Sequence, residues 1–230
     1  MNLLKPIALA SLVVFAGAAS AQASKFQGGF GQIGVGYESV DPSHASSTLT
    51  VNGRSIPVTT SANNANSVIG TVGLGWYQDV AKGFLLGIGA EYSPFAGSNG
   101  SMSVSTTTRL PGQQAATNDY TYQMKNSYNI FLSPAMTLGA DGLAYAKVGY
   151  TGAQVATYNS QTSNFTGYSL GLGYKQIFNA GWYAFIEANY ANYGNQTVYV
   201  NDPPGGPAIS ASGTNGLTSM NALVGVGYKF

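Results

Sequence analysis

The last ten residues, Asn221–Phe230, read NALVGVGYKF. Apolar or aromatic side chains take every second position, at Ala222, Val224, Val226, Tyr228 and Phe230. Leucine, glycine and polar residues stand between them, so Lys229 falls on the opposite face of an extended chain. A period of two over ten residues predicts a β-strand with one apolar face.

The same alternation recurs along the rest of the chain, and no segment shows the 3.6-residue period of an amphipathic helix. We count eight alternating segments after residue 23, and each predicts a strand. Their approximate ranges are 29–40, 66–77, 83–95, 119–132, 142–156, 164–177, 181–194 and 217–230.

The connections between these segments alternate in length. Segments 78–82, 133–141 and 178–180 are short, whereas 41–65, 96–118 and 195–216 are long and rich in Ser, Thr, Asn and Gly; 157–163 is intermediate. The two ends of the strands therefore face different environments. This alternation is typical of transmembrane β-barrels, which have short turns at one end and long loops at the other.

Charged residues inside the strands all lie on one face, opposite the apolar face. Backbone groups that cross a lipid bilayer are satisfied only in helices or in closed barrels. We therefore expect the apolar face to contact lipid and the charged face to line a barrel interior. The predicted interior charges are Glu38, Glu91, Lys125, Lys147, Lys175, Glu187 and Lys229. They can form a salt-bridged plug or line a narrow, gated pore, and the sequence leaves both readings open.

Aromatic and glycine spacing agrees with this arrangement. Phe84 and Tyr92 lie eight residues apart on the apolar face, as do Trp182 and Tyr190. In a tilted strand this separation is about 20 Å of height, which approximates the apolar band between two aromatic girdles. Paired glycines recur on the inward face, as in the sequence GVGY at 225–228, and we expect them to make room for neighbouring Lys and Glu side chains.

The N-terminal 23 residues have the pattern of a secretory signal peptide. Lys5 precedes an apolar segment at 7–19 that is too short to span a bilayer as a helix, and Ala21 and Ala23 form an A-x-A cleavage site. The predicted domains are therefore a signal peptide at 1–23 and one β-barrel domain at 24–230.

Composition argues against several classes of function. The formal net charge is +1, so no nucleic-acid partner is expected, and the absence of cysteine excludes disulfides and thiol chemistry. Only 7% of the residues are charged. His44, the one histidine, lies in the sequence DPSH at 41–44, which we assign to a loop. We see no strand-borne His–Ser pair, so we predict no catalytic residues, no metal site and no cofactor.

Together these features resemble the small eight-stranded outer-membrane barrels of the OmpA-transmembrane, OmpX and opacity-protein type. The resemblance covers 24–230 and implies an all-β, antiparallel, up-and-down barrel in the bacterial outer membrane. It implies contact with outer-membrane lipid and lipopolysaccharide, and a monomer. It also implies that the terminal alternation is a signal read by the barrel assembly machinery, carried by Val224, Val226, Tyr228 and Phe230.

The function favoured by the sequence is structural and interactive: envelope integrity, and adhesion to an extracellular partner through the outer loops. The first alternative is a low-conductance pore for small solutes. The second, less favoured, is a lipid-modifying enzyme that uses His44.

Overall fold

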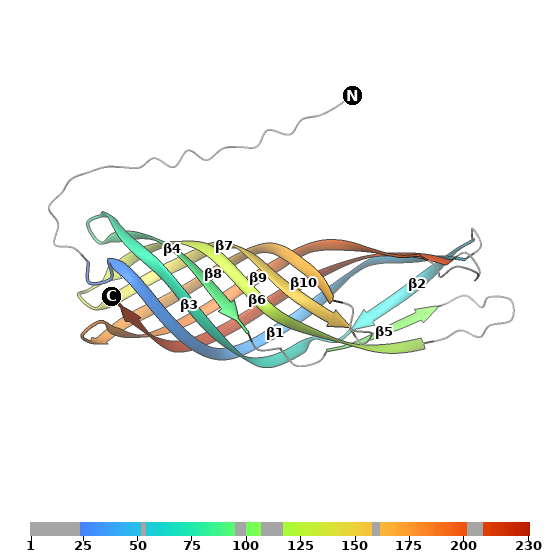
Figure 1. Ribbon diagram of the computed structural model, residues 1–230, viewed down its shortest axis with the longest axis horizontal. Helices are drawn as coiled ribbons and strands as arrows, with labels where there is room; N and C mark the ends of the chain where they lie inside the picture. Colours follow the sequence, from blue (N-terminus) through green and yellow to red (C-terminus); the bar gives the residue numbers. More distant parts are fainter. Residues whose placement is uncertain (1–23, 52–53, 95–99, 107–116, 158–161, 202–208) are drawn as a thin grey trace, which may run out of the picture.

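The described residues of the computed structural model are 24–51, 54–94, 100–106, 117–157, 162–201 and 209–230. They form antiparallel β-strands that wrap into an elongated barrel (Figure 1). The predicted signal peptide and its cleavage site, Ala21 and Ala23, lie outside these residues. The strands are β1 (Gly28–Val51), β2 (Arg54–Ala62), β3 (Ala65–Ala81), β4 (Phe84–Ser93), β5 (Gly100–Thr106), β6 (Thr117–Leu138), β7 (Gly142–Thr157), β8 (Thr162–Asn179), β9 (Trp182–Asn201) and β10 (Ile209–Lys229).

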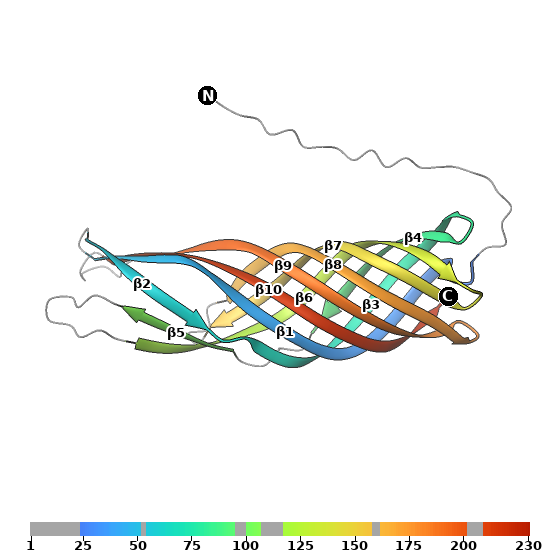
Figure 2. The same ribbon diagram turned by 180° about the vertical axis from the view of Figure 1, so that it is seen from behind.

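Eight of these strands form the closed ring that the sequence predicts. The order is β1-β3-β4-β6-β7-β8-β9-β10, and β10 pairs with β1 to complete it. Figure 2 shows this seam from behind, with β1, β10 and β9 side by side. The terminal alternating stretch is therefore the strand that closes the barrel against its first strand.

The pairing register fixes the dimensions of the barrel. We follow the paired residues from strand to strand around the barrel, starting at Glu38 of β1. The series is Asn221, Asn189, Gly171, Lys147, Ser133, Gly87 and Tyr77, and it returns to β1 at Gly28. The series comes back ten residues away from its start, so the shear number is ten. With eight strands about 4.8 Å apart, this shear gives a tilt of about 40° and a backbone radius of about 8 Å. Such an interior is narrow enough for side chains to fill.

Three short turns gather at one end of the barrel, which we call the turn end. They lie between β3 and β4, β6 and β7, and β8 and β9. Each contains one glycine with a left-handed backbone: Gly83 at φ 77°, Gly139 at φ 71° and Gly181 at φ 87°. Glycine adopts this conformation without steric cost, which allows the strands to reverse direction sharply. The opposite end is called the loop end.

The prediction of long loops at 41–65, 96–118 and 195–216 is wrong for much of these segments, and in the last of them β9 continues to Asn201 and β10 begins at Ile209. In the first two, β1 continues to Val51, and β2 and β5 form additional strands. Towards the loop end β2 and β5 take the places of β3 and β4 between β1 and β6. Thr, Val and Ile favour strands, but the high Ser and Thr content of these segments led us to expect loops.

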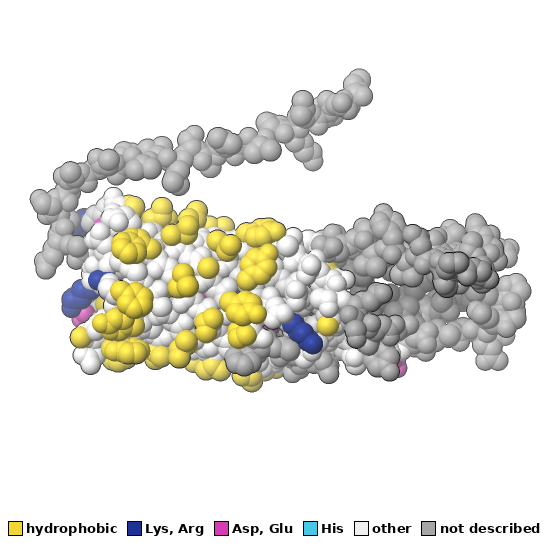
Figure 3. All heavy atoms as spheres, in the orientation of Figure 1, with side chains coloured by type: hydrophobic (Ala, Val, Ile, Leu, Met, Phe, Trp, Pro, Cys, Tyr) yellow, Lys and Arg dark blue, Asp and Glu magenta, His cyan; other side chains and the backbone are white. Residues whose placement is uncertain are grey.

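The outside of the barrel is apolar over the turn-end half, as the face assignment predicts (Figure 3). Outward tyrosines mark the limit of this apolar band towards the loop end: Tyr37, Tyr92, Tyr128, Tyr150, Tyr168 and Tyr190. We call these six residues the tyrosine girdle. Five outward aromatic residues mark the limit of the band near the turn end: Trp76, Phe84, Trp182, Tyr228 and Phe230. The rings of Trp182 and Tyr228 pack edge to face, with their centroids 5.3 Å apart. Two aromatic girdles around an apolar band are typical of a membrane barrel. No helix of the described residues has the length and hydropathy that a membrane span requires.

Candidate functional site: the filled interior and its central cavity

Two apolar clusters occupy the barrel interior, one towards each end. The turn-end cluster contains Phe26, Phe30, Ile69, Tyr77, Leu85, Ala135, Leu143, Tyr145, Tyr183, Phe185 and Leu223. The loop-end cluster contains Val40, Ala65, Tyr122, Met124, Ala153, Val155, Phe165, Tyr193 and Leu217. A layer of charged and polar side chains lies between them.

The inward face therefore carries large rings that the sequence reading did not anticipate. It also corrects the expected role of the inward glycines, most of which accommodate rings rather than Lys or Glu. A Cβ added to Gly87 would lie 2.5 Å from the ring of Tyr77, and one added to Gly227 would overlap the ring of Tyr183. The sequence did show these aromatic residues on the same strand face as the charges, but an alternating pattern by itself does not say which face is inside.

Lys147 occupies the centre of the polar layer and is almost fully buried. Its ammonium donates to Glu91 Oε2 at 2.5 Å and to Glu187 Oε1 at 2.8 Å. The side chains of Lys147 and Glu187 are each 1% exposed, and that of Glu91 is 11% exposed. Three strands, β4, β7 and β9, are thus joined across the barrel by one cation and two carboxylates.

Neutral groups complete the bonding of these carboxylates. Gln32 Nε2 donates to Glu91 at 3.2 Å, and the hydroxyl of Tyr183 donates to Gln32 Oε1 at 3.0 Å. The hydroxyl of Tyr145 donates to Glu187 Oε2 at 2.7 Å. Among the described residues, no fully buried side-chain nitrogen or oxygen lacks a hydrogen-bond partner. A buried polar network that is satisfied in this way holds one arrangement of the strands.

Lys175 lies nearer the turn end, inside a cage of aromatic rings. Its Nζ is 3.8 Å from the ring centroid of Phe30, 4.8 Å from Tyr183, and 5.2 Å from both Tyr77 and Tyr145. A cation over ring faces is attracted by their quadrupoles, most strongly where water is excluded. The charge and the rings together block the barrel axis at this level.

The other predicted residues have different surroundings. The prediction of Lys125 as an interior charge is wrong. Tyr122 and Met124 of the same strand point into the loop-end cluster, so Lys125 lies on the outward face, and a register shift between Lys125 and Tyr128 reverses the two faces there. Lys125 and Lys229, at the end of β10, form no ion pair with another described residue. The proposed assembly residues all point outwards: Val224, Val226 and Tyr228 from β10, and Phe230 directly after it.

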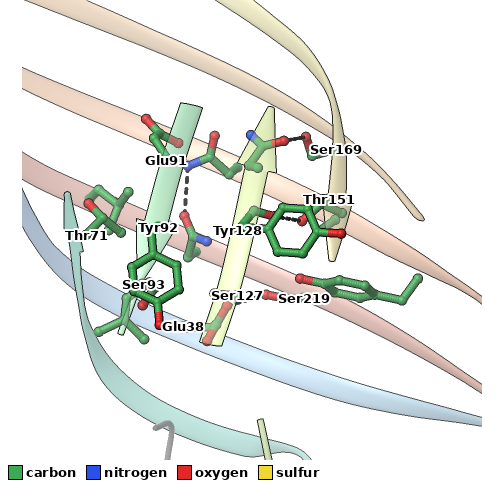
Figure 4. A pocket seen from close by; sticks show the side chains of 17 residues that line it. Glu38, Thr71, Glu91, Tyr92, Ser93, Ser127, Tyr128, Thr151, Ser169 and Ser219 are labelled. Atoms are coloured by element: carbon green, nitrogen blue, oxygen red, sulfur yellow. Dashed lines mark hydrogen bonds between the residues drawn. The ribbon is translucent and has the colours of Figure 1, made fainter. Parts of the chain in front are cut away.

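A small central cavity remains between the polar layer and the loop-end cluster (Figure 4). Its volume is about 60 Å³, which is room for a few water molecules. Its polar lining comes from Glu38 and Glu91 and from serine, threonine, asparagine and tyrosine side chains of the surrounding strands. Glu38 is 5% exposed, and its Oε1 accepts a hydrogen bond of 2.6 Å from Ser219.

The segment that contains His44 is not the loop that the sequence suggested. Its backbone continues β1 and pairs with β10, His44 opposite Asn215. The side chain of His44 lies outside what the structure describes. The described residues bring no three His, Cys, Asp or Glu side chains together in a group that could hold a metal ion.

Comparison with known proteins places this architecture in a family. The model for the outer membrane protein beta-barrel domain matches residues 8–230. Among solved structures, the outer membrane protein OprG from Pseudomonas aeruginosa superposes with a TM-score of 0.56 at 14% identity, covering 90% of this chain and 98% of that one. The outer membrane protease OmpT from Escherichia coli gives a TM-score of 0.50 at 10% identity, covering 92% of this chain and 99% of that one. No curated protein sequence matches the chain. At these identities the two structures show a shared fold alone.

Proposed function

Because the chain belongs to the outer membrane protein β-barrel domain family, we propose that it acts as a closed, monomeric surface protein. In this proposal it supports the integrity of the outer membrane and binds an extracellular partner with its loop end, without catalysis or transport. The protein resides in the bacterial outer membrane, among its lipids and lipopolysaccharide. We further propose that the barrel assembly machinery inserts it by recognising β10.

The filled interior is the observation that carries the proposal. Tyr77, Leu85, Leu143, Lys175 and Tyr183 are each no more than 2% exposed, although they belong to five different strands of the ring. A solute would have to displace this cluster and separate the ion pairs of Lys147 before it could cross. An eight-stranded barrel with such an interior favours a plug over a pore.

The wall beyond the tyrosine girdle supports a role at the loop end. β1 continues for 14 residues past Tyr37, and β9 and β10 pair as far as Asn201 and Ser210. β2 and β5 join the same wall, next to β1 and β6. Main-chain hydrogen bonding makes this projection a more rigid surface for recognition than separate loops would be.

Conductance of the refolded chain 24–230 in a planar bilayer tests the closed interior. We expect the wild-type protein to be silent and the double variant Tyr77→Ala, Tyr183→Ala to conduct, because it removes two rings of the plug. Discrete openings of the wild-type protein at the level of the variant would refute the proposal. The variant also controls for insertion, since its conductance shows that barrels have entered the bilayer.

Removal of 45–62 tests the loop end. We expect the shortened barrel to keep the heat-modifiable gel shift of folded protein. In a strain that lacks the gene, it should fail to restore surface attachment and detergent resistance. Full restoration would contradict a role for the projection.

A low-conductance pore is the second candidate, because the central cavity already provides a polar compartment inside the barrel. It requires the turn-end cluster to open, which the conductance measurement detects. A lipid-modifying activity requires His44, so hydrolysis of lipopolysaccharide that His44→Ala abolishes would favour that reading.

A further inference from the structure

The buried charges of the barrel do not balance. Among the described residues, the interior between the two girdles holds three carboxylates, Glu38, Glu91 and Glu187, and two ammonium groups, Lys147 and Lys175. Lys147 bridges Glu91 and Glu187, and Lys175 lies within its aromatic cage. The group of Glu91, Lys147 and Glu187 keeps one negative charge, which the positive charge of nearby Lys175 balances without a direct bond. The negative charge that remains is that of Glu38.

Glu38 has no positive partner in the described part of the chain. It accepts hydrogen bonds from two neutral groups, the hydroxyl of Ser219 and the side-chain amide of Asn221, and no described lysine forms an ion pair with it. Removing an uncompensated carboxylate from water costs several kcal/mol even after relaxation of its surroundings. A group or ion that supplies one positive charge beside Glu38 would offset this cost.

The central cavity is the space beside Glu38, and its lining determines what can occupy it (Figure 4). Three asparagine amides line it, Asn129, Asn189 and Asn221, together with hydroxyls that include Thr71, Ser169 and Ser219. Carboxylate, amide and hydroxyl oxygens suit hard cations, whereas no imidazole or thiolate is available there for softer metals. At about 60 Å³ the cavity admits an ion with part of its hydration, but not a solute of several heavy atoms.

From these observations we propose that the central cavity binds one monovalent alkali cation, held by Glu38 and the surrounding amide and hydroxyl oxygens. Its single charge neutralises the interior. A divalent ion would leave the interior positive by one and would lack the several anionic ligands that such ions take. The site is independent of the proposed surface role.

The cation dependence of thermal stability tests the site. Refolded protein is heated in sodium, potassium or N-methyl-D-glucamine chloride at equal ionic strength. A ligand that binds only the folded state raises the unfolding midpoint with its concentration. We expect a midpoint at least about 3 °C higher in sodium or potassium at tenfold excess over the dissociation constant than in the bulky cation. Equal midpoints in all three salts would overturn the proposal, because screening alone does not distinguish these cations.

Two variants locate the effect. Glu38→Gln should lose the difference between salts and should be more stable than wild type in N-methyl-D-glucamine, because it removes the uncompensated charge. Asp41→Asn is the matched control: it makes the same charge change three residues further along β1 at an exposed position, and should keep the difference. A difference that persists in Glu38→Gln would place the cation elsewhere and refute the assignment.

A direct measurement covers the case in which Glu38→Gln does not fold. Crystals of the wild-type protein grown in rubidium chloride should show an anomalous scattering peak inside the cavity. An empty cavity in these crystals, together with stability that follows pH but not the cation, would show that a proton neutralises Glu38 instead.

Discussion

Lys147→Met removes the central positive charge while keeping most of the volume of the side chain. The methionine still packs near the ring of Phe131, whose centroid is 4.4 Å from the lysine Nζ. What it loses is the bonds to Glu91 and Glu187, which leaves two carboxylates with little exposure and no cation between them. Breaking a buried ion pair by removing one partner costs about 3–5 kcal/mol. A loss of that size lowers the folding equilibrium constant at least about a hundredfold.

Urea unfolding in phospholipid vesicles measures this loss. Trp76 and Trp182 face outwards at 53% and 47% exposure, so their fluorescence reports the departure of the barrel from lipid. We expect a lower midpoint with an unchanged slope, because the surface exposed on unfolding stays the same. Lys229→Met is the control: it removes a lysine without an ion pair to a described residue and should change the free energy of unfolding by less than about 0.5 kcal/mol.

The triple variant Lys147→Met, Glu91→Gln, Glu187→Gln separates the charge from the packing. Neutral glutamines relieve the desolvation cost, so it should recover at least half of the loss of the single variant. The reasoning is refuted if Lys147→Met costs no more than Lys229→Met, or if the triple variant is as unstable as the single one.

Three further predictions follow from the packing and the seam. Gly87→Ala should destabilise the barrel by about 1–3 kcal/mol, because its Cβ would meet a tyrosine ring. Gly194→Ala, whose Cβ would have its nearest neighbour at 3.6 Å, should cost less than half as much in the same urea titration. Tyr183→Phe should lose about 1 kcal/mol with its bond to Gln32, and an unchanged midpoint would contradict that assignment. Deletion of Phe230 should lower the yield of folded protein in cells more than it slows refolding in detergent, and equal effects would reject a recognition role.

The sequence predicts the ring because its strongest signal, a period of two, gives eight strands, and consecutive strands joined by short connections pair as neighbours. The eight strands follow from the period of two, and the inward position of Glu91, Lys147 and Glu187 follows once the signal peptide and the loop lengths indicate a membrane barrel. Phase also identifies the outward tyrosines. These features depend on residues close together in the sequence, which is why they can be derived without a structure.

The contents of the interior depend on the register between strands distant in sequence, and the alternation does not give that register. The register between strands places Lys175 among Phe30 and three tyrosines, and it places Glu38 beside Ser219. The sequence presented the inward lysines and glutamates as one equivalent set. The sequence analysis also missed the strands β2 and β5. Their ladders form only at the loop end of the barrel, beyond the ends of β3 and β4, and pair residues whose register the sequence does not give.

The seam between β1 and β10 has a consequence for how the barrel forms. Its ladder runs from the pair Phe30–Lys229 to the pair Val51–Ile209 and joins residues more than 150 positions apart. Loop-closure entropy must be overcome before such distant pairs contribute, which makes this step late and slow. Until it is complete, both edge strands expose unpaired backbone that can join another chain. Kinetic competition between ring closure and aggregation therefore sets the yield of folded barrel, and a catalyst that holds β10 in place would act at this step.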